Sequence, residues 1–211
     1  MMTPVEPTFV HPTAILDADV QLGPGTKIWH FSHVLSGARL GAQCHIGQNV
    51  VIGRNVMIGD RCRIQNNVTV YEEVTLEEEV FCGPSMVFTN VIIPRAHISR
   101  KHELRPTLVK RGCSIGANAT IVCGSVLGRY SLIGAGSVVT KDIPDHALMI
   151  GNPARRTGWV CQCGNKLRLI PSVKPSGDAT NSNPDLYTCP VCVMTYHSVA
   201  GCGLEAITQA R

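Results

Sequence analysis

Aliphatic side chains recur in this sequence at a spacing of six residues, with one interruption. Eighteen of these 20 positions hold Leu, Ile or Val: Val10, Leu16, Leu22, Ile28, Val34, Leu40, Ile46, Ile52, Ile58, Ile64, Val70, Leu76, Cys82, Phe88, then Val109, Ile115, Ile121, Leu127, Ile133 and Val139. Gly directly follows nine of them. A period of six fits neither a helix, with about 3.6 residues per turn, nor an ordinary hairpin strand. It predicts short strands joined by tight corners, where Gly and Asn tolerate unusual backbone angles.

Three such hexads make one triangular coil, and stacked coils would bury a column of aliphatic side chains. The residue four places after each aliphatic position is usually small or β-branched, as expected of a second inward position: Ala38, Cys44, Val50, Val56, Cys62, Val68, Val74, Ala119, Ser125, Ser131 and Ser137. An aromatic content of 5% suits a narrow core. A sandwich of short strands would not keep a strict period through 14 consecutive hexads. The sequence therefore predicts an all-β parallel solenoid.

The interruption lies within residues 88–112, "FTNVIIPRAHISRKHELRPTLVKRG". One hexad ends at Ile93 and the next begins at Val109, and the gap of 15 residues is not a multiple of six. Residues 94–108 are therefore predicted to leave the coil as a loop at a corner, and a loop of this length is often functional. Its charged and His side chains are Arg95, His97, Arg100, Lys101, His102, Glu103 and Arg105. A solvated surface loop is the simple alternative, whereas a loop that covers an anionic, phosphate-bearing ligand explains the basic composition better.

Charge and cysteine content narrow the setting of the protein. The net charge is +4 and no long run of like charges occurs, so nucleic-acid binding has no support. The N-terminus lacks the pattern of a signal peptide, and no apolar stretch is long enough to span a membrane. Ten Cys in such a chain indicate reduced thiols or metal ligands, and we expect a cytoplasmic protein. Cys44, Cys62 and Cys113 occupy inward positions and are interpreted as small hydrophobic residues.

Several stretches resemble a known family. The hexads "IGQNVVIGRNVMIGD" and the ending "GNPARRTGWV" are similar to the left-handed parallel β-helix (hexapeptide-repeat) acyltransferases. The stretches "KIWHFSHV", "IQNNVTVYEEVTLE" and "VFCGPSMVFTNVIIPRA" resemble one branch of that family more narrowly. The resemblance covers roughly residues 9–163. It implies a left-handed coil and a homotrimer with active sites between subunits.

For the chemistry, the same resemblance implies an N-acetyltransferase. Members of this branch transfer acetyl from acetyl-CoA to the 3-amino group of UDP-2-acetamido-3-amino-2,3-dideoxy-glucuronic acid, for the diacetamido uronic acids of surface polysaccharides such as the lipopolysaccharide O-antigen. The resemblance further implies that no dedicated His base is used. Asn90 then positions the amine, and the departing CoA sulfur collects the proton. His30, His33, His97 and His102 are the candidates for a base if one is used.

Positions that repeat once per coil should stack on one corner, about 4.8 Å from coil to coil. Below Asn90 this places a polar ladder of Glu72, Arg54 and Ser36, and a second corner carries His30, Gln48 and Asn66. The "QNN" stretch with Tyr71 and Glu72 is denser in polar groups than corners require. Asn49, Asn55 and Asn118 need no explanation beyond backbone tolerance. The residues predicted to bind the nucleotide sugar are His33, Gln65, Asn66, Asn67, Tyr71, Glu72, Arg95 and Lys101.

A column of small residues follows the loop. Gly116 and Ala117 lie one coil before Gly134 and Ala135, and small side chains there would let the extended thiol arm of CoA run along the coils. A tight corner alone would also explain them. Basic residues at the far end could meet the nucleotide phosphates of CoA. The residues predicted to bind acetyl-CoA are Gly116, Ala117, Ala135, Lys141 and Arg155, with Arg156 as a further candidate.

The C-terminal tail is predicted to be separate, giving a coil domain at residues 1–160 and a Cys-rich appendage at residues 161–211. "CQCG" and "CPVC" supply two close cysteine pairs, Cys161 with Cys163 and Cys189 with Cys192, which favour a small zinc ribbon. Four thiolate ligands would leave no open position for water, so the zinc would be structural. The span between the pairs reads as a flexible loop. Cys202 remains unassigned.

Three alternatives stay open. The first is an acetyltransferase for another nucleotide amino sugar or small acceptor on the same fold. The second is a hexapeptide-fold carbonic anhydrase, suggested by the H-x4-H spacing of His97 and His102, although these lie in the predicted loop and no matching third His is evident. The third is a non-catalytic scaffold, which would not turn over acetyl-CoA.

Overall fold

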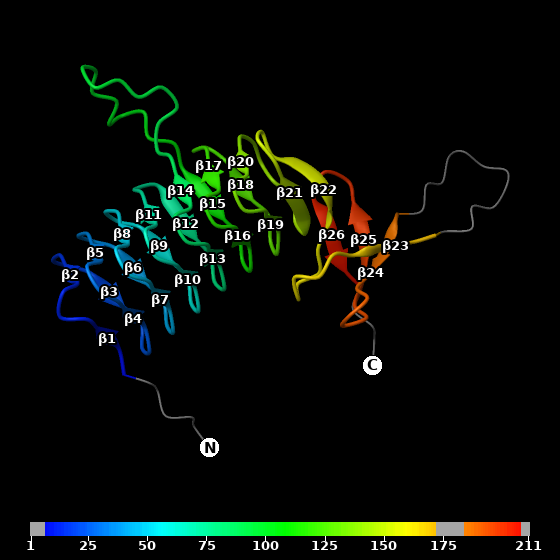
Figure 1. Ribbon diagram of the computed structural model, residues 1–211, viewed down its shortest axis with the longest axis horizontal. Coiled ribbons are helices and arrows are strands. Elements are labelled where there is room, and N and C mark those ends of the chain that lie inside the picture. Colours follow the sequence, from blue (N-terminus) through cyan, green and yellow to red (C-terminus); the bar gives the residue numbers. More distant parts are fainter. Residues whose placement is uncertain (1–6, 172–183, 208–211) are drawn as a thin grey trace.

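The computed structural model describes residues 7–171 and 184–207, and these form strands, turns and loops with no helix among them. Three sheets make the faces of a solenoid (Figure 1). Sheet A contains β1 (Phe9–Val10), β4 (Lys27–Ile28), β7 (His45–Ile46), β10 (Arg63–Ile64), β13 (Phe81–Cys82), β16 (Ser114–Ile115), β19 (Leu132–Ile133), β21 (Ala147–Ile150) and β22 (Arg155–Trp159). Sheet B contains β2 (Ile15–Leu16), β5 (His33–Val34), β8 (Val51–Ile52), β11 (Thr69–Val70), β14 (Val87–Phe88), β17 (Thr120–Ile121) and β20 (Val138–Val139). Sheet C contains β3 (Gln21–Leu22), β6 (Arg39–Leu40), β9 (Met57–Ile58), β12 (Val74–Leu76), β15 (Thr107–Val109) and β18 (Val126–Leu127).

Each coil visits the sheets in the order A, B, C, and we name the corners A–B (residues 47–50 in one coil), B–C (53–56) and C–A (59–62). Strands stack in parallel, each on the equivalent strand of the next coil, as in His33 with Val51 and Val51 with Thr69. From Ile28 to Val139 every aliphatic position of the hexads is buried. The second inward positions are buried too, including Cys44, Cys62 and Cys113, except for Ile92 at the base of the loop. The predicted parallel β-solenoid and its core are confirmed.

The interruption is visible as a change of register. Val74 pairs with Thr107, Phe81 with Ser114, and Val87 with Thr120, so the numbers of paired residues differ by 33 there and by 18 in the coils before them. The excess equals the predicted insertion. The inserted chain leaves at the B–C corner after β14 and projects from the solenoid as the long loop in Figure 1.

The predicted end of this loop was wrong by two residues. Thr107 and Leu108 belong to β15, where they pair with Val74 and Thr75 of β12. These two strands are three residues long rather than two, because Thr107 is buried and extends the ladder by one pair. The last residue of the loop is therefore Pro106.

The corners place one residue every six in the left-handed region of backbone space. Asn49, Asn55 and Asn118 have φ values of 57°, 55° and 55°, which confirms that these Asn residues serve the backbone. The same conformation occurs at Phe31 and Arg61, with φ of 57° and 56°. The regular turn thus imposes the angle even on side chains that favour it little.

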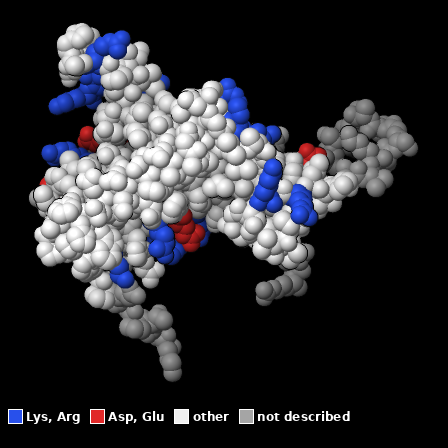
Figure 2. Space-filling view, viewed as in Figure 1, with Lys and Arg blue, Asp and Glu red and all other residues white. Residues whose placement is uncertain are grey.

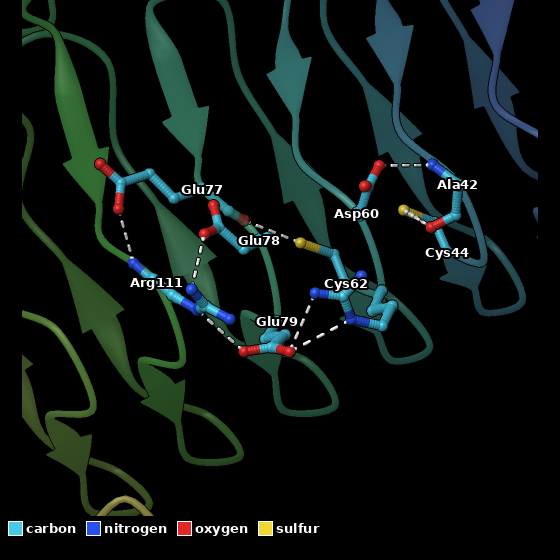
Figure 3. A network of polar contacts seen from close by, with 9 residues as sticks. Ala42, Cys44, Asp60, Cys62, Glu77, Glu78, Glu79 and Arg111 are labelled. Carbon is cyan, nitrogen blue, oxygen red and sulfur yellow. Dashed lines mark hydrogen bonds and ion pairs between the residues drawn. The ribbon is translucent and has the colours of Figure 1, made fainter.

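A polar network lies at the C–A corner and was not predicted from the sequence (Figure 3). Arg111 and Arg61 both donate to Glu79, at 3.1 Å and 3.0 Å, and hold the pKa of that carboxyl below its usual value. Glu77 Oε2 accepts from the backbone N–H of Arg111 at 2.8 Å. Residues of three successive coils are joined here, so the network braces the solenoid along its axis.

Beyond the last hexad, β21 and β22 form an antiparallel pair at the end of sheet A. A fourth sheet, sheet D, follows with antiparallel strands β23 (Arg168–Ile170), β24 (Leu186–Thr188), β25 (Thr195–Val199) and β26 (Gly203–Ala206). It lies against the C-terminal end of the solenoid (Figure 1). Within the described residues there is no helix that is long and apolar enough to cross a membrane.

Candidate active site

Sheet B is bordered by the two corners that carry the predicted substrate and CoA residues. Its outward row consists of Ile15, His33, Val51, Thr69, Val87, Thr120 and Val138, as the strand registers show. The A–B corner, with Gly116 and Ala117, lies at one edge of this row, and the B–C corner, with Asn90, lies at the other. Candidate residues for the two substrates thus lie on both sides of sheet B.

Asn90 stands where the predicted ladder reaches the loop. It is half-buried and three residues beyond Val87, and Glu72, Arg54 and Ser36 occupy the same position in the three preceding coils. The backbone carbonyl of Asn90 accepts a hydrogen bond from the N–H of Arg105 at 3.1 Å. This bond closes the base of the loop, so Asn90 is fixed from the backbone side while its amide remains partly exposed.

The lower end of the ladder holds a side-chain hydrogen bond that the sequence did not reveal. His33 Nε2 lies 2.8 Å from Asp17 Oδ1, and the Ser36 N–H donates to Asp17 Oδ2 at 3.3 Å. The hydrogen bond with His33 lowers the pKa of Asp17, and the charge of Arg54 adds to the effect. His33 lies three coils from the level of Asn90, about 14 Å at the usual strand spacing. Within one chain it therefore cannot take a proton at Asn90.

The loop presents several cations at its surface. Arg100 is half-buried and donates to both carboxylate oxygens of Glu103, at 2.7 Å and 2.9 Å, and His102 lies 3.5 Å from the same carboxylate. Arg95 and Lys101 are exposed, and blue Lys and Arg side chains stand out on the projecting loop in Figure 2. Among the described residues, no third ligand accompanies His97 and His102 to make a metal site.

A hollow of about 310 Å³ lies at the base of the loop, lined by Ile92, Ile93, Glu103, Leu104 and Arg105. Ile92 and Ile93 are 47% and 54% exposed, which is unusual for Ile, so the apolar part of this hollow is uncovered in the single chain. A ligand or a neighbouring chain could bury this surface.

The "QNN" stretch has a structural part in the A–B corner. Asn66 Oδ1 accepts from the Gln48 N–H at 2.8 Å, and Asn67 Oδ1 accepts from Asn49 Nδ2 at 2.9 Å. Asn67 also has a φ of 60°. These bonds link consecutive coils, whereas Gln65 is half-buried and Tyr71 is 39% exposed beside Glu72. A role of these five residues in substrate binding stays a prediction.

The column of small residues lies in the A–B corner as the register predicts. A Cβ on Gly116 would approach the Ala135 N–H to 2.5 Å, so close stacking of the coils already requires glycine there. Ala135 is exposed at the same corner of the next coil. Arg155 begins β22 at this end of the molecule, and Lys141 is exposed at the B–C corner of the last coil. Their contacts with CoA stay a prediction.

His146 was missed by the sequence analysis because it falls outside the hexads. It is buried, its Nδ1 lies 3.0 Å from the Val160 carbonyl, and its ring packs against Tyr130 and Tyr196. Burial lowers its pKa. His146 thus connects the last coil with sheet D and does not face sheet B.

The four predicted cysteines of the tail do come together. The sulfurs of Cys161, Cys163, Cys189 and Cys192 all lie within 4.8 Å of one another. The prediction that these residues form one cluster is confirmed.

The fold and these corners define a hexapeptide-repeat transferase. The family described as "Bacterial transferase hexapeptide (six repeats)" matches residues 19–54, 37–72 and 106–141, and only Pro106 of the loop falls within these ranges. The chain is also 52% identical over 170 residues to the dTDP-3-amino-3,6-dideoxy-alpha-D-galactopyranose 3-N-acetyltransferase of Aneurinibacillus thermoaerophilus, an alignment covering 81% of this chain and 88% of that relative. The chain therefore belongs to the hexapeptide-repeat acetyltransferase family and is an enzyme of that class.

More distant similarities exist. The Bifunctional protein GlmU of Thermotoga maritima is 33% identical over 85 residues, which is 38% of this chain and 19% of that protein. The acetyltransferase domain of PglB from Neisseria gonorrhoeae in complex with acetyl coenzyme A is 21% identical, with a TM-score of 0.48, and the match covers 72% of this chain and 58% of that chain. The narrower prediction, the glucuronate branch, is not confirmed by these relatives.

Proposed function

We propose that this enzyme transfers acetyl from acetyl-CoA to the 3-amino group of a nucleotide-linked 3-amino-3-deoxy hexose. The main support is the relative that is 52% identical over nearly its whole length and whose name specifies a 3-N-acetyltransferase of a nucleotide amino sugar. The position of Asn90, half-buried at the point where a basic loop leaves the solenoid, is consistent with an anionic sugar nucleotide held beneath that loop.

The chemistry requires few protein groups. The neutral amine attacks the thioester carbonyl carbon, a C–N bond forms, and negative charge develops on the carbonyl oxygen. The C–S bond then breaks, and the proton of the nitrogen passes to the departing CoA sulfur. Asn90 orients the amine, and alignment of two bound substrates supplies most of the rate. Backbone N–H groups at the corners are available as donors to the developing oxyanion.

The acceptor we favour is a dTDP-linked 3-amino-3,6-dideoxy hexose, because the near full-length relative is named for such a substrate. UDP-2-acetamido-3-amino-2,3-dideoxy-glucuronic acid is the second candidate. Its support is Arg54, an exposed cation in the same column as Asn90, together with Arg95 and Lys101 on the loop, since a uronic carboxylate would need such a partner.

We further propose that the active enzyme is a homotrimer in the cytoplasm. The outward row of sheet B contains exposed apolar side chains, Val51 at 37% and Val87 at 46%, between the two corners that carry the candidate residues. A second copy that covers this row would also enclose the substrates. All ten cysteines are free, in keeping with a reducing compartment.

The test is release of CoA thiol from acetyl-CoA with a panel of acceptors: the dTDP-linked 3-amino-3,6-dideoxy hexose, the UDP-linked uronic acid, its 6-hydroxymethyl analogue and a dTDP-4-amino sugar. We expect fast release with the first. Release only with the uronic acid would move the substrate to the second candidate and point to Arg54. Release only with the 4-amino sugar would contradict the 3-amino assignment, and no release with any acceptor would contradict the whole proposal.

A further inference from the structure

Four thiols converge at the start of sheet D. Cys161 and Cys163 lie directly after β22, and Cys189 and Cys192 lie in the turn between β24 and β25. The sulfur of Cys161 is 3.4 Å from that of Cys192, and the sulfur of Cys163 is 3.6 Å from that of Cys189. Two turns that lie far apart in the sequence thus bring their cysteines to one point.

These distances match a metal site better than a disulfide site. A disulfide requires sulfurs about 2.05 Å apart, whereas four sulfurs at about 2.3 Å from a tetrahedral zinc ion are about 3.8 Å from one another. The observed pairs and the limit of 4.8 Å for the whole group bracket that value. We propose that Cys161, Cys163, Cys189 and Cys192 bind one structural Zn²⁺ as four thiolates, and that this zinc holds sheet D as a cap on the end of the solenoid.

The surroundings of the sulfurs suit thiolate ligands. The buried Tyr196 hydroxyl lies 3.0 Å from Cys161 Sγ, and Asn165 Nδ2 donates to Cys163 Sγ at 3.4 Å. Both groups can donate hydrogen bonds to a negatively charged sulfur, which is how side chains around a metal site orient and stabilise its ligands. Because all four ligands are cysteines, no position remains for water or substrate, so the site is structural and not catalytic.

Among the described residues, sheet D has a small apolar core. Its buried cluster consists of Cys161, Leu167, Cys189, Tyr196 and Leu204, and two of these five are ligands themselves. Small units of this kind usually depend on a metal or disulfides, because their apolar core is insufficient. Zinc would supply the missing free energy, since it binds only when the two turns are brought together.

The metal site is linked directly to the last coil. The ring of His146 lies 4.9 Å from that of Tyr196, whose hydroxyl contacts Cys161. The Asp145 N–H donates to the Cys202 carbonyl at 3.0 Å, and Gly203 forms a bridge with Asp145. A Cβ on Gly203 would overlap the backbone carbonyl of Asp145, so the contact is as close as glycine allows. The zinc-bound sheet therefore covers an end of the solenoid that would otherwise be open.

The test is the metal content of the full-length protein, purified from zinc-supplemented medium without chelators and measured by mass spectrometry. We expect about one zinc per chain. Zinc should be released by a mercurial thiol reagent. Replacement by Co²⁺ should give the charge-transfer and visible bands of tetrahedral cobalt thiolate. The metal content, the release by a mercurial reagent and the cobalt spectrum need no variant and do not depend on acetyltransferase activity.

Cys163→Ser and Cys192→Ser should lower the zinc retained after dialysis against a chelator at least about tenfold. Cys163 is exposed, so its replacement opens no cavity. The matched control is Cys202→Ser, which changes an exposed cysteine outside the cluster and should keep its zinc. The proposal is overturned if the protein is metal-free and the four cluster thiols react with a thiol reagent, or if a thiol count without reductant shows two disulfides. Stoichiometric iron, or equal zinc in Cys163→Ser and Cys202→Ser, would overturn it as well.

Discussion

For Asn90, the sequence predicted the position in the fold but not the chemical role. Its place above Glu72 and Arg54 follows from counting three hexads at a time, because a strict repeat fixes which side chains share a corner. Its proposed role came from resemblance alone, since one amide among many polar corner residues carries no chemical signature. The structure adds that its carbonyl closes the base of the loop.

Replacing Asn90 by Ala should lower kcat about 10²-fold while leaving the KM for acetyl-CoA unchanged. The orientation of the amine is lost, whereas the predicted CoA residues Gly116, Ala117 and Ala135 are unchanged. Steady-state thiol release with varied acetyl-CoA measures both. Gln21→Ala, an exposed change on β3 of sheet C, is the control and should keep full activity. An Asn90→Ala enzyme with wild-type kcat would remove this residue from the mechanism.

Other residues had roles that no pattern could reveal. The hydrogen bond between Asp17 and His33 joins neighbouring coils. The two residues are 16 apart, which differs from the repeat spacing of 18, so a search at that spacing misses it. Asn66 and Asn67 were predicted to bind substrate. Their side-chain oxygens accept hydrogen bonds from the preceding coil, and the substrate role stays a prediction. A polar residue at a corner can serve the stack as readily as a substrate, and local sequence does not distinguish the two.

His146 predicts a pH dependence of stability. Burial lowers its pKa in the folded protein, the charge of Asp145 raises it and that of Arg129 lowers it. The unfolded chain then binds more protons than the folded one below the ordinary His pKa of about 6.5, so this contribution to stability is present above that pH and is lost as the pH falls through it. His146→Phe should flatten the fall in melting temperature between neutral and mildly acidic pH. Parallel curves for both proteins would contradict this.

At the scale of elements, the loop could be predicted and its exact end could not. A gap of 15 in a period of six can only be an excursion, and the register shift in all three sheets confirms it. Thr107 was assigned to the loop because it precedes the first aliphatic position, yet it is buried and paired. Strand ends depend on pairing with Val74, which is distant in the sequence, and local sequence carries little information about it.

Replacing residues 91–104 with two glycines should preserve the fold and abolish turnover. No residue from 91 to 106 is fully buried, so little apolar contact is lost, and the bond between Asn90 and Arg105 already brings the chain ends together. Melting temperature and circular dichroism would report the fold, and thiol release would report activity. A loop variant that unfolds would contradict the independence of the core, and one that retains full activity would contradict a role of the loop in catalysis.

The whole molecule leaves one face that a second copy could cover. Val87 lies in the outward row of sheet B and is 46% exposed, while Met57 is 45% exposed on sheet C. If the trimer forms through sheet B, Val87→Lys should reduce the mass in solution from three times 22.7 kDa towards one chain, and Met57→Lys should not. Light scattering after size exclusion measures this. The same response of both variants would place the interface elsewhere.

The closure of the loop at its base has a consequence for how such enzymes can diverge. A hydrogen bond between Asn90 and Arg105 joins the two ends of the loop. The strands on either side of the insertion pair in parallel, as they do in the other coils. The length and composition of the excursion are thus free to vary without a repacking of the core. A graft of another loop at these two residues is therefore expected to leave the stacking of the coils unchanged.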